Sequence, residues 1–91
     1  MLKEVGTVIH VGETVQVSEK FKKRDLVLRM DGMYPQEVKF EAKQDRCSLL
    51  DELRLHQEIE VNFALEGRRW EKEPGRPEWF NTLTIIGVKH I

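Results

Sequence analysis

Residues 59–84 read IEVNFALEGRRWEKEPGRPEWFNTLT, and this stretch decides the fold. Every second residue from Ile59 to Leu65 is apolar and the residues between are polar or small, which is the period of a β-strand with one buried face. After a segment rich in Pro and Gly, the chain returns as Trp79-Phe80-Asn81-Thr82. We therefore predict a long β-hairpin.

The end of this hairpin concentrates aromatic and cationic side chains, namely Arg68, Arg69, Trp70, Arg76 and Trp79. An indole can stack on a nucleobase while a neighbouring guanidinium binds phosphate, and these two interactions hold single-stranded nucleic acid. Trp70 lies on the parity opposite to the apolar residues of its strand, so we expect it to be exposed. An alternative stays open for the tryptophans, because they can also pack on each other across the hairpin without any ligand. The neighbouring Phe80 is predicted to belong to the core.

The remaining sequence predicts three more strands before the hairpin and one helix. The strands span residues 5–17, 26–30 and 38–42, and Gly6 and Gly12 lie inside the first, where a strand can coil or bulge. The second of the two hairpin strands is expected to run from about residue 79 to residue 88.

The period changes in residues 45–55, where Cys47, Leu50 and Leu53 have helical spacing. Asp45 or Ser48 is expected to cap the first turn of this helix. Three strands, a helix and two strands is the order of the OB fold. We therefore predict an all-β (mainly β) protein: a five-stranded OB-fold Greek-key barrel with one short α-helix between strands 3 and 4, in a single domain of residues 1–91.

Composition limits the classes of function. The 91 residues include 15 basic and 16 acidic ones, for a formal net charge of −1, which is not the strongly basic footprint of many nucleic-acid binders. A nucleic-acid site must therefore depend on how the charges are distributed. The chain has no long apolar run and no hydrophobic segment of signal-peptide type at its start, so we expect a cytoplasmic protein. The single cysteine, Cys47, has no partner for a disulfide and is expected to be a small buried residue.

No pattern in the chain indicates catalysis. His10, His56 and His90 have no cysteine, serine or carboxylate at the spacing of a catalytic triad or a metal cluster. No glycine-rich phosphate loop occurs either. We expect a protein that is not an enzyme, with no metal and no cofactor.

Several short motifs, in their order and spacing, carry a resemblance over nearly the whole chain: Gly6-Thr7-Val8-Ile9, Lys22-Lys23 before Leu26-Val27-Leu28, Tyr34-Pro35, Phe40-Glu41, Arg68 and Trp70 as Arg-x-Trp, and Trp79-Phe80-Asn81-Thr82. The chain resembles a family of small bacterial and phage proteins catalogued as a domain of unknown function, which is similar to the single-stranded DNA-binding OB proteins. The resemblance implies that single-stranded nucleic acid is the ligand, with DNA favoured over RNA. It also implies self-association into a homodimer or a higher homo-oligomer.

In OB folds the ligand binds the outer face of strands 2 and 3, between the loops that join strands 1 to 2 and 4 to 5. That placement predicts a site with a basic and aromatic wall on each side and two cations on the face between them. Its members are Phe21, Lys22, Lys23, Arg24, Arg29, Lys39, Arg68, Arg69, Trp70, Arg76 and Trp79. The alternative is an OB module that docks a protein partner or dimerises without binding nucleic acid, since Trp and Arg also dominate protein interfaces.

Overall fold

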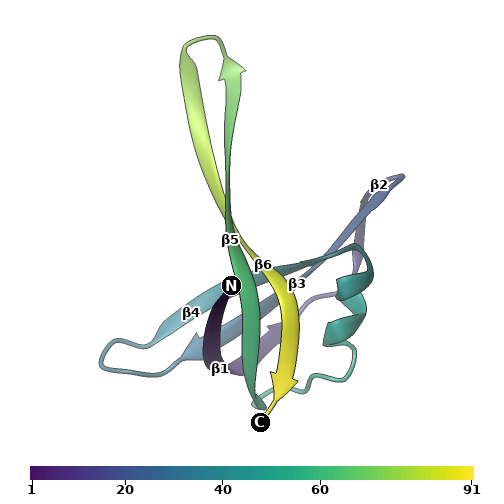
Figure 1. The fold of residues 1–91 in the computed structure, drawn as a ribbon, viewed down its shortest axis with the longest axis vertical. Helices are drawn as coiled ribbons and strands as arrows, with labels where there is room; N and C mark the ends of the chain where they lie inside the picture. Colours follow the sequence, from purple (N-terminus) through teal and green to yellow (C-terminus); the bar gives the residue numbers. More distant parts are fainter.

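The computed structural model describes residues 1–91, and five of its six strands close into a barrel. The elements are β1 (Leu2–Val11), β2 (Val15–Ser18), β3 (Phe21–Met30), β4 (Gln36–Lys43), the 3-10 helix η1 (Gln44–Leu50), β5 (Glu58–Glu73) and β6 (Arg76–His90). The strand order is β1-β5-β6-β4-β3, and β1 pairs again with β3 to close the circle. All neighbours are antiparallel except β4 and β6, which meet in parallel at Glu41 and Thr84. The predicted OB-fold barrel is confirmed (Figure 1).

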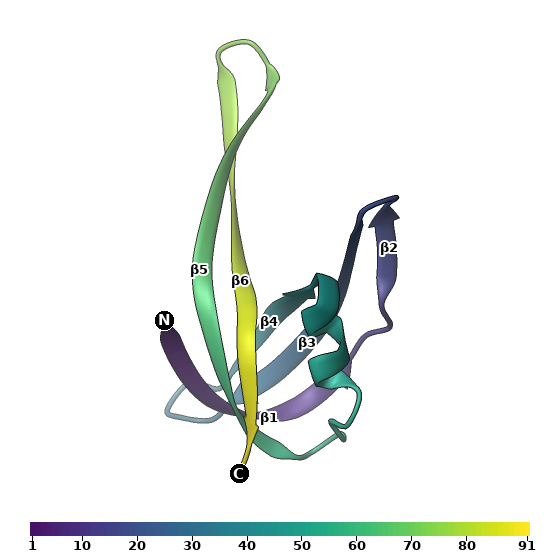
Figure 2. The same cartoon turned by 45° about the vertical axis from the view of Figure 1, so that its right-hand side comes forward.

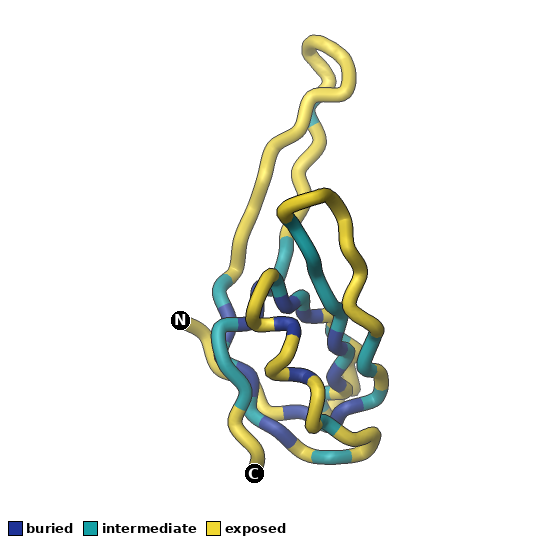
Figure 3. Tube along the Cα trace, turned by 90° about the vertical axis from the view of Figure 1, so that its right-hand side faces the viewer, coloured by how far each residue is buried: buried dark blue, intermediate teal, exposed yellow.

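Alternating apolar side chains fill the barrel. The fully buried residues of the strands include Val8, Leu26, Leu28, Phe40 and Ile59. They point inward because successive strand residues face opposite sides of the sheet. The rings of Phe40 and Phe63 meet edge to face, with 5.0 Å between ring centroids. The buried segments lie together in one half of the molecule (Figure 3). The end of β5, the start of β6 and all of β2 extend away from it and are mostly exposed.

The helix closes one end of the barrel, and it differs from the prediction. Cys47 and Leu50 are buried against the core, as their spacing predicted. The predicted short helix between the third and fourth strands of the barrel is confirmed in its position, but it is a 3-10 helix and ends at Leu50, so its prediction as an α-helix reaching residue 55 is wrong. At three residues per turn, side chains three apart lie directly above one another, so this spacing suits a 3-10 helix as well as an α-helix. The predicted cap is wrong too, because no side chain caps the first turn and Ser48 Oγ instead donates to the Asp45 carbonyl.

The predicted first strand over residues 5–17 is two strands. The amide of Gly12 donates to the Asp25 carbonyl at 2.9 Å, and the chain then leaves the barrel. It continues as β2, which pairs with the first residues of β3, Val15 opposite Lys23. This pairing makes the basic run of residues 22–24 part of a strand, whereas the sequence analysis placed it in a loop.

Strands β5 and β6 continue beyond the barrel as a twisted two-stranded ribbon, defined as residues 65–83 (Figures 1 and 2). The long hairpin is therefore confirmed. Gly75 forms its turn with φ of 79°, a conformation that favours glycine. The chain has no helix with the length and hydrophobicity that crossing a bilayer requires.

Candidate functional site

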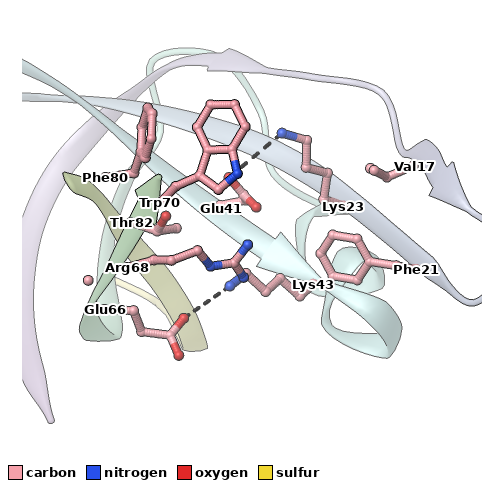
Figure 4. Close-up of a pocket in the computed structure, with 11 residues that line it drawn as sticks. Val17, Phe21, Lys23, Glu41, Lys43, Glu66, Arg68, Trp70, Phe80 and Thr82 are labelled. Atoms are coloured by element: carbon pink, nitrogen blue, oxygen red, sulfur yellow. Dashed lines mark hydrogen bonds and ion pairs between the residues drawn. The ribbon is translucent and has the colours of Figure 1, made fainter. Parts of the chain in front are cut away.

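A groove of about 480 Å³ lies between the ribbon and the outer face of β3 and β4. Three parts of the chain line it: the hairpin of β2 and the first residues of β3 (residues 15–23, here called the β2–β3 arm), the outward side of β3 and β4, and one face of the ribbon (Figure 4). The lining residues are Val17, Phe21, Lys23, Glu41, Lys43, Glu66, Gly67, Arg68, Trp70, Phe80 and Thr82.

The floor of the groove carries two lysines, each paired with a carboxylate. Lys23 and Lys43 are direct partners across β3 and β4, so their like charges would repel one another. The Nζ atom of Lys43 lies 3.0 Å from Glu66 Oε1, and the Nζ atom of Lys23 lies 3.9 Å from Glu41 Oε2. Both lysines are therefore partly neutralised by the protein itself.

One face of the ribbon forms an aromatic and cationic wall. Glu66, Arg68 and Trp70 alternate along β5 and share this face. Phe80 lies opposite Arg68 on β6, and its ring centroid is 6.4 Å from that of Trp70. Trp70 and Phe80 are each 49% exposed, so both rings present area to the groove. Trp70 was predicted to be exposed and is. The prediction of Phe80 as a core residue is wrong, because Phe80 has the outward parity of β6, opposite to that of the buried Ile85.

Glu66 is anchored from two sides. Its Oε1 atom accepts hydrogen bonds from Lys43 Nζ and from the hydroxyl of Thr84, which is buried in β6. The pKa of Glu66 is lowered, first by the hydrogen bond from Thr84 and then by the hydrogen bond and the positive charge of Lys43. The carboxylate therefore stays ionised at neutral pH.

The opposite wall is the β2–β3 arm, which contributes Val17 and Phe21. Gln44 holds this arm in place: its Nε2 donates to the Lys20 carbonyl at 2.8 Å, and its Oε1 accepts from the Lys22 amide at 3.3 Å. Gln44 has φ of 54° and is the first residue of η1, so the arm is tied to the start of the helix.

The groove brings together four of the residues that the sequence analysis assigned to a site: Phe21, Lys23, Arg68 and Trp70. Each lies on the strand parity that faces the groove. In β3 this parity excludes Lys22 and Arg24. The side chain of Arg24 is only 16% exposed and bonds to the carbonyls of Gly12 and Cys47 and to the Asp51 carboxylate.

The remaining five assigned residues lie outside the groove. Arg29 is paired with Asp31 at 3.2 Å, and Lys39 is exposed on β4. Arg69 and Trp79 are direct partners on the ribbon face that points away from the groove, and Arg76 lies at the hairpin turn. Trp70 and Trp79 therefore do not form a pair across the hairpin.

Sequence reasoning missed several lining residues, chiefly Val17, Lys43, Glu66, Phe80 and Thr82. A signal for two of them was present. Lys43 has the outward parity of β4, and Glu66 has the same parity as Arg68 and Trp70. Extending that parity through the whole hairpin would have placed Glu66 beside the predicted wall.

Comparison with solved structures shows the same fold. The chain is similar to the mitochondrial single-stranded DNA-binding protein Rim1 from S. cerevisiae, with a TM-score of 0.72 and 12% identity over 99% of this chain and 92% of that one. It is also similar to the SSB domain of a protein from Synechococcus sp., with a TM-score of 0.66 and 21% identity over 99% of this chain and 96% of that one.

No curated protein matches the chain significantly in sequence. A family model does match, over residues 4–89, and it is described as a domain of unknown function, DUF3127. The match covers almost the whole barrel and the ribbon. The chain belongs to the DUF3127 family, whose barrel here is that of an OB fold similar to single-stranded DNA-binding domains.

Proposed function

We propose that this protein binds single-stranded nucleic acid, DNA in preference to RNA, in the groove between the ribbon and the outer face of β3 and β4. One observation carries the proposal: two half-exposed rings, Trp70 and Phe80, lie side by side next to Arg68, on a single face that looks across the groove to Lys23 and Lys43. Aromatic platforms beside cations are what an unpaired strand requires. The likeness of the fold to single-stranded DNA-binding domains supports the same proposal, and DNA is favoured on that ground.

The charge balance of the groove indicates binding mainly through the bases. Three cations line it, and two of them already have carboxylate partners. For single strands, the slope of log K against log salt is about −0.7 for each neutralised phosphate. If only Arg68 binds a phosphate the slope is about −0.7, and if both lysines also exchange their carboxylates for phosphates it is about −2.

The experiment is a titration of fluorescently labelled oligo-dT at several salt concentrations, with oligo-U of equal length as the RNA competitor. We expect binding with a slope between these two limits. Trp70→Ala should lower the affinity by about 1–3 kcal/mol, the contribution of one stacked base. Trp79→Ala is the matched control, because that indole lies on the other face of the ribbon. No binding of either oligo-dT or oligo-dC at low salt would refute the proposed function, and an equal loss in the two variants would refute the assignment of the groove.

A second candidate function is docking of another copy of this chain on the far face of the ribbon. Leu65 and Trp79 lie on this face with 63% and 68% of their surface exposed. A two-stranded hairpin without a third layer is marginally stable in water, so covering this face would stabilise it. Arg69 and Glu71 alternate on the same face and have opposite charges, which allows two copies to pair reciprocally about a two-fold axis. Sedimentation velocity of the wild type and of Trp79→Ser tests this candidate, and a monomer at all concentrations would refute it.

A further inference from the structure

The groove contains one carboxylate that is held in place yet open to a ligand. Of the two acids that line it, the Glu41 side chain is only 15% exposed, whereas that of Glu66 is 51% exposed. A carboxylate in a groove for a polyanion costs affinity, since it repels phosphate. A favourable contribution of Glu66 to binding must therefore come from a hydrogen bond that its carboxylate accepts.

Both anchors of Glu66 bind the same oxygen. Lys43 and Thr84 donate to Oε1, and no donor of the chain bonds to Oε2. The side chain thus has a fixed orientation with a second oxygen that is free to accept. Because the pKa of Glu66 is lowered, this oxygen is an acceptor and not a donor at neutral pH.

The free oxygen lies on the same surface as the stacking groups. Glu66 and Arg68 are two residues apart on one face of β5, a separation of about 7 Å along the strand. Phe80 is opposite Arg68 and is therefore a diagonal neighbour of Glu66. In Figure 4 the guanidinium of Arg68 lies between the carboxylate of Glu66 and the indole of Trp70. A base that stacks on the Arg68 plane or on Phe80 can thus turn its edge toward Glu66, which is how proteins read unpaired bases.

We infer that Glu66 makes the groove selective for bases with an exocyclic amino group, with its Oε2 atom accepting a hydrogen bond from that group. Cytosine meets the requirement, since its N4 amino group donates to carboxylates in known base contacts. Thymine does not, because its N3–H lies between two carbonyl oxygens that a carboxylate repels. This inference rests on the proposed function and adds to it a basis for choosing among sequences.

The test compares the affinities of oligo-dC and oligo-dT of equal length at mildly alkaline pH, where cytosine is uncharged. We expect the wild type to prefer oligo-dC roughly five- to tenfold, the low end of what one good base contact contributes. In Glu66→Gln the new amide both donates and accepts, so the preference should fall to about one. Glu58→Gln is the matched control: it removes the same charge from the other end of the same strand, outside the groove, and should keep the preference.

Three outcomes would overturn the inference. The wild type could bind both oligonucleotides equally or prefer oligo-dT, or Glu66→Gln could bind both more tightly by one common factor. The last result would mean that Glu66 only repels phosphate. If the wild type bound neither oligonucleotide, the proposed function would fail together with this inference, whereas equal binding of both leaves the proposed function standing.

Discussion

Replacing Arg24 should destabilise the fold, because its guanidinium joins three separate parts of the chain. Its Nε atom donates to the Gly12 carbonyl at 2.7 Å, where β1 leaves the barrel. Its Nη1 atom donates to the Cys47 carbonyl at 3.2 Å and to Asp51 Oδ1 at 2.6 Å, at the helix that closes the barrel. Residues far apart in sequence are thus held by one side chain.

The magnitude follows from these bonds. A hydrogen bond to a charged group contributes about 1.5–3 kcal/mol. The Asp51 side chain is 64% exposed, so that ion pair adds at most about 1 kcal/mol. Counting both carbonyls at the low end, Arg24→Ala should lower the free energy of unfolding by roughly 3 kcal/mol. For a domain of this size the thermal midpoint should then fall by about 12–24 °C.

The assay is thermal unfolding followed by circular dichroism. Arg24→Lys keeps the charge but not the planar fork, so it should recover less than half of the lost stability. Lys22→Ala removes a neighbouring cation that forms no side-chain bond, and its free energy of unfolding should stay within about 0.5 kcal/mol of the wild type. If the thermal midpoint of Arg24→Ala fell by less than about 4 °C and the variant bound oligo-dT more weakly, the structural role would be refuted. Arg24 would then be a ligand-binding residue, as the sequence predicted.

Two further predictions concern stability. The lowered pKa of Glu66 means that its stabilising contribution is complete above the ordinary value of 4.5 and is lost as the pH falls from there through the lowered pKa. In urea, the stability difference between wild type and Glu66→Gln should therefore be present at pH 7 and shrink in acid, and a constant difference would contradict the prediction. Phe40 is fully buried against Phe63, so Phe40→Ala should cost about 3–5 kcal/mol in urea unfolding. Tyr34→Ala, at an exposed turn, is the control, and an equally small effect of both changes would show that Phe40 does not hold the core.

Much of the fold could be predicted because strand periodicity is local. Leu26, Leu28, Phe40 and Val61 point inward as their alternation predicted. Periodicity does not show where a strand leaves the barrel, so it could not separate the buried Ile85 from the exposed Trp79, which has the same parity in the same strand. Nor does periodicity show that β2 folds back on the first residues of β3, with Val15 opposite Lys23, because alternation within one strand does not identify the strand that it pairs with.

The candidate site was predictable only in part, for a related reason. Charge and aromatic character identified Arg68 and Trp70, and the alternation of β5 placed both on one side. The same criteria also selected three residues that lie outside the groove. The side chain of Arg24 bonds to the Gly12 carbonyl, and Arg69 and Trp79 lie on the opposite face of the ribbon. The two lysines of the groove are paired with carboxylates far away in sequence, Lys23 with Glu41 and Lys43 with Glu66, and composition does not reveal such pairs.

The tie between Gln44 and the β2–β3 arm determines how the groove can change its width. One side is fastened to the helix that plugs the barrel, so displacing Phe21 would also strain the start of that helix. Beyond Glu66, the other side is a pair of strands with no buried residue and no covering layer (Figure 2), so it can bend there without breaking a buried contact. Purines and pyrimidines, which differ in breadth, would therefore be accommodated by flexing of the hairpin against a stationary wall.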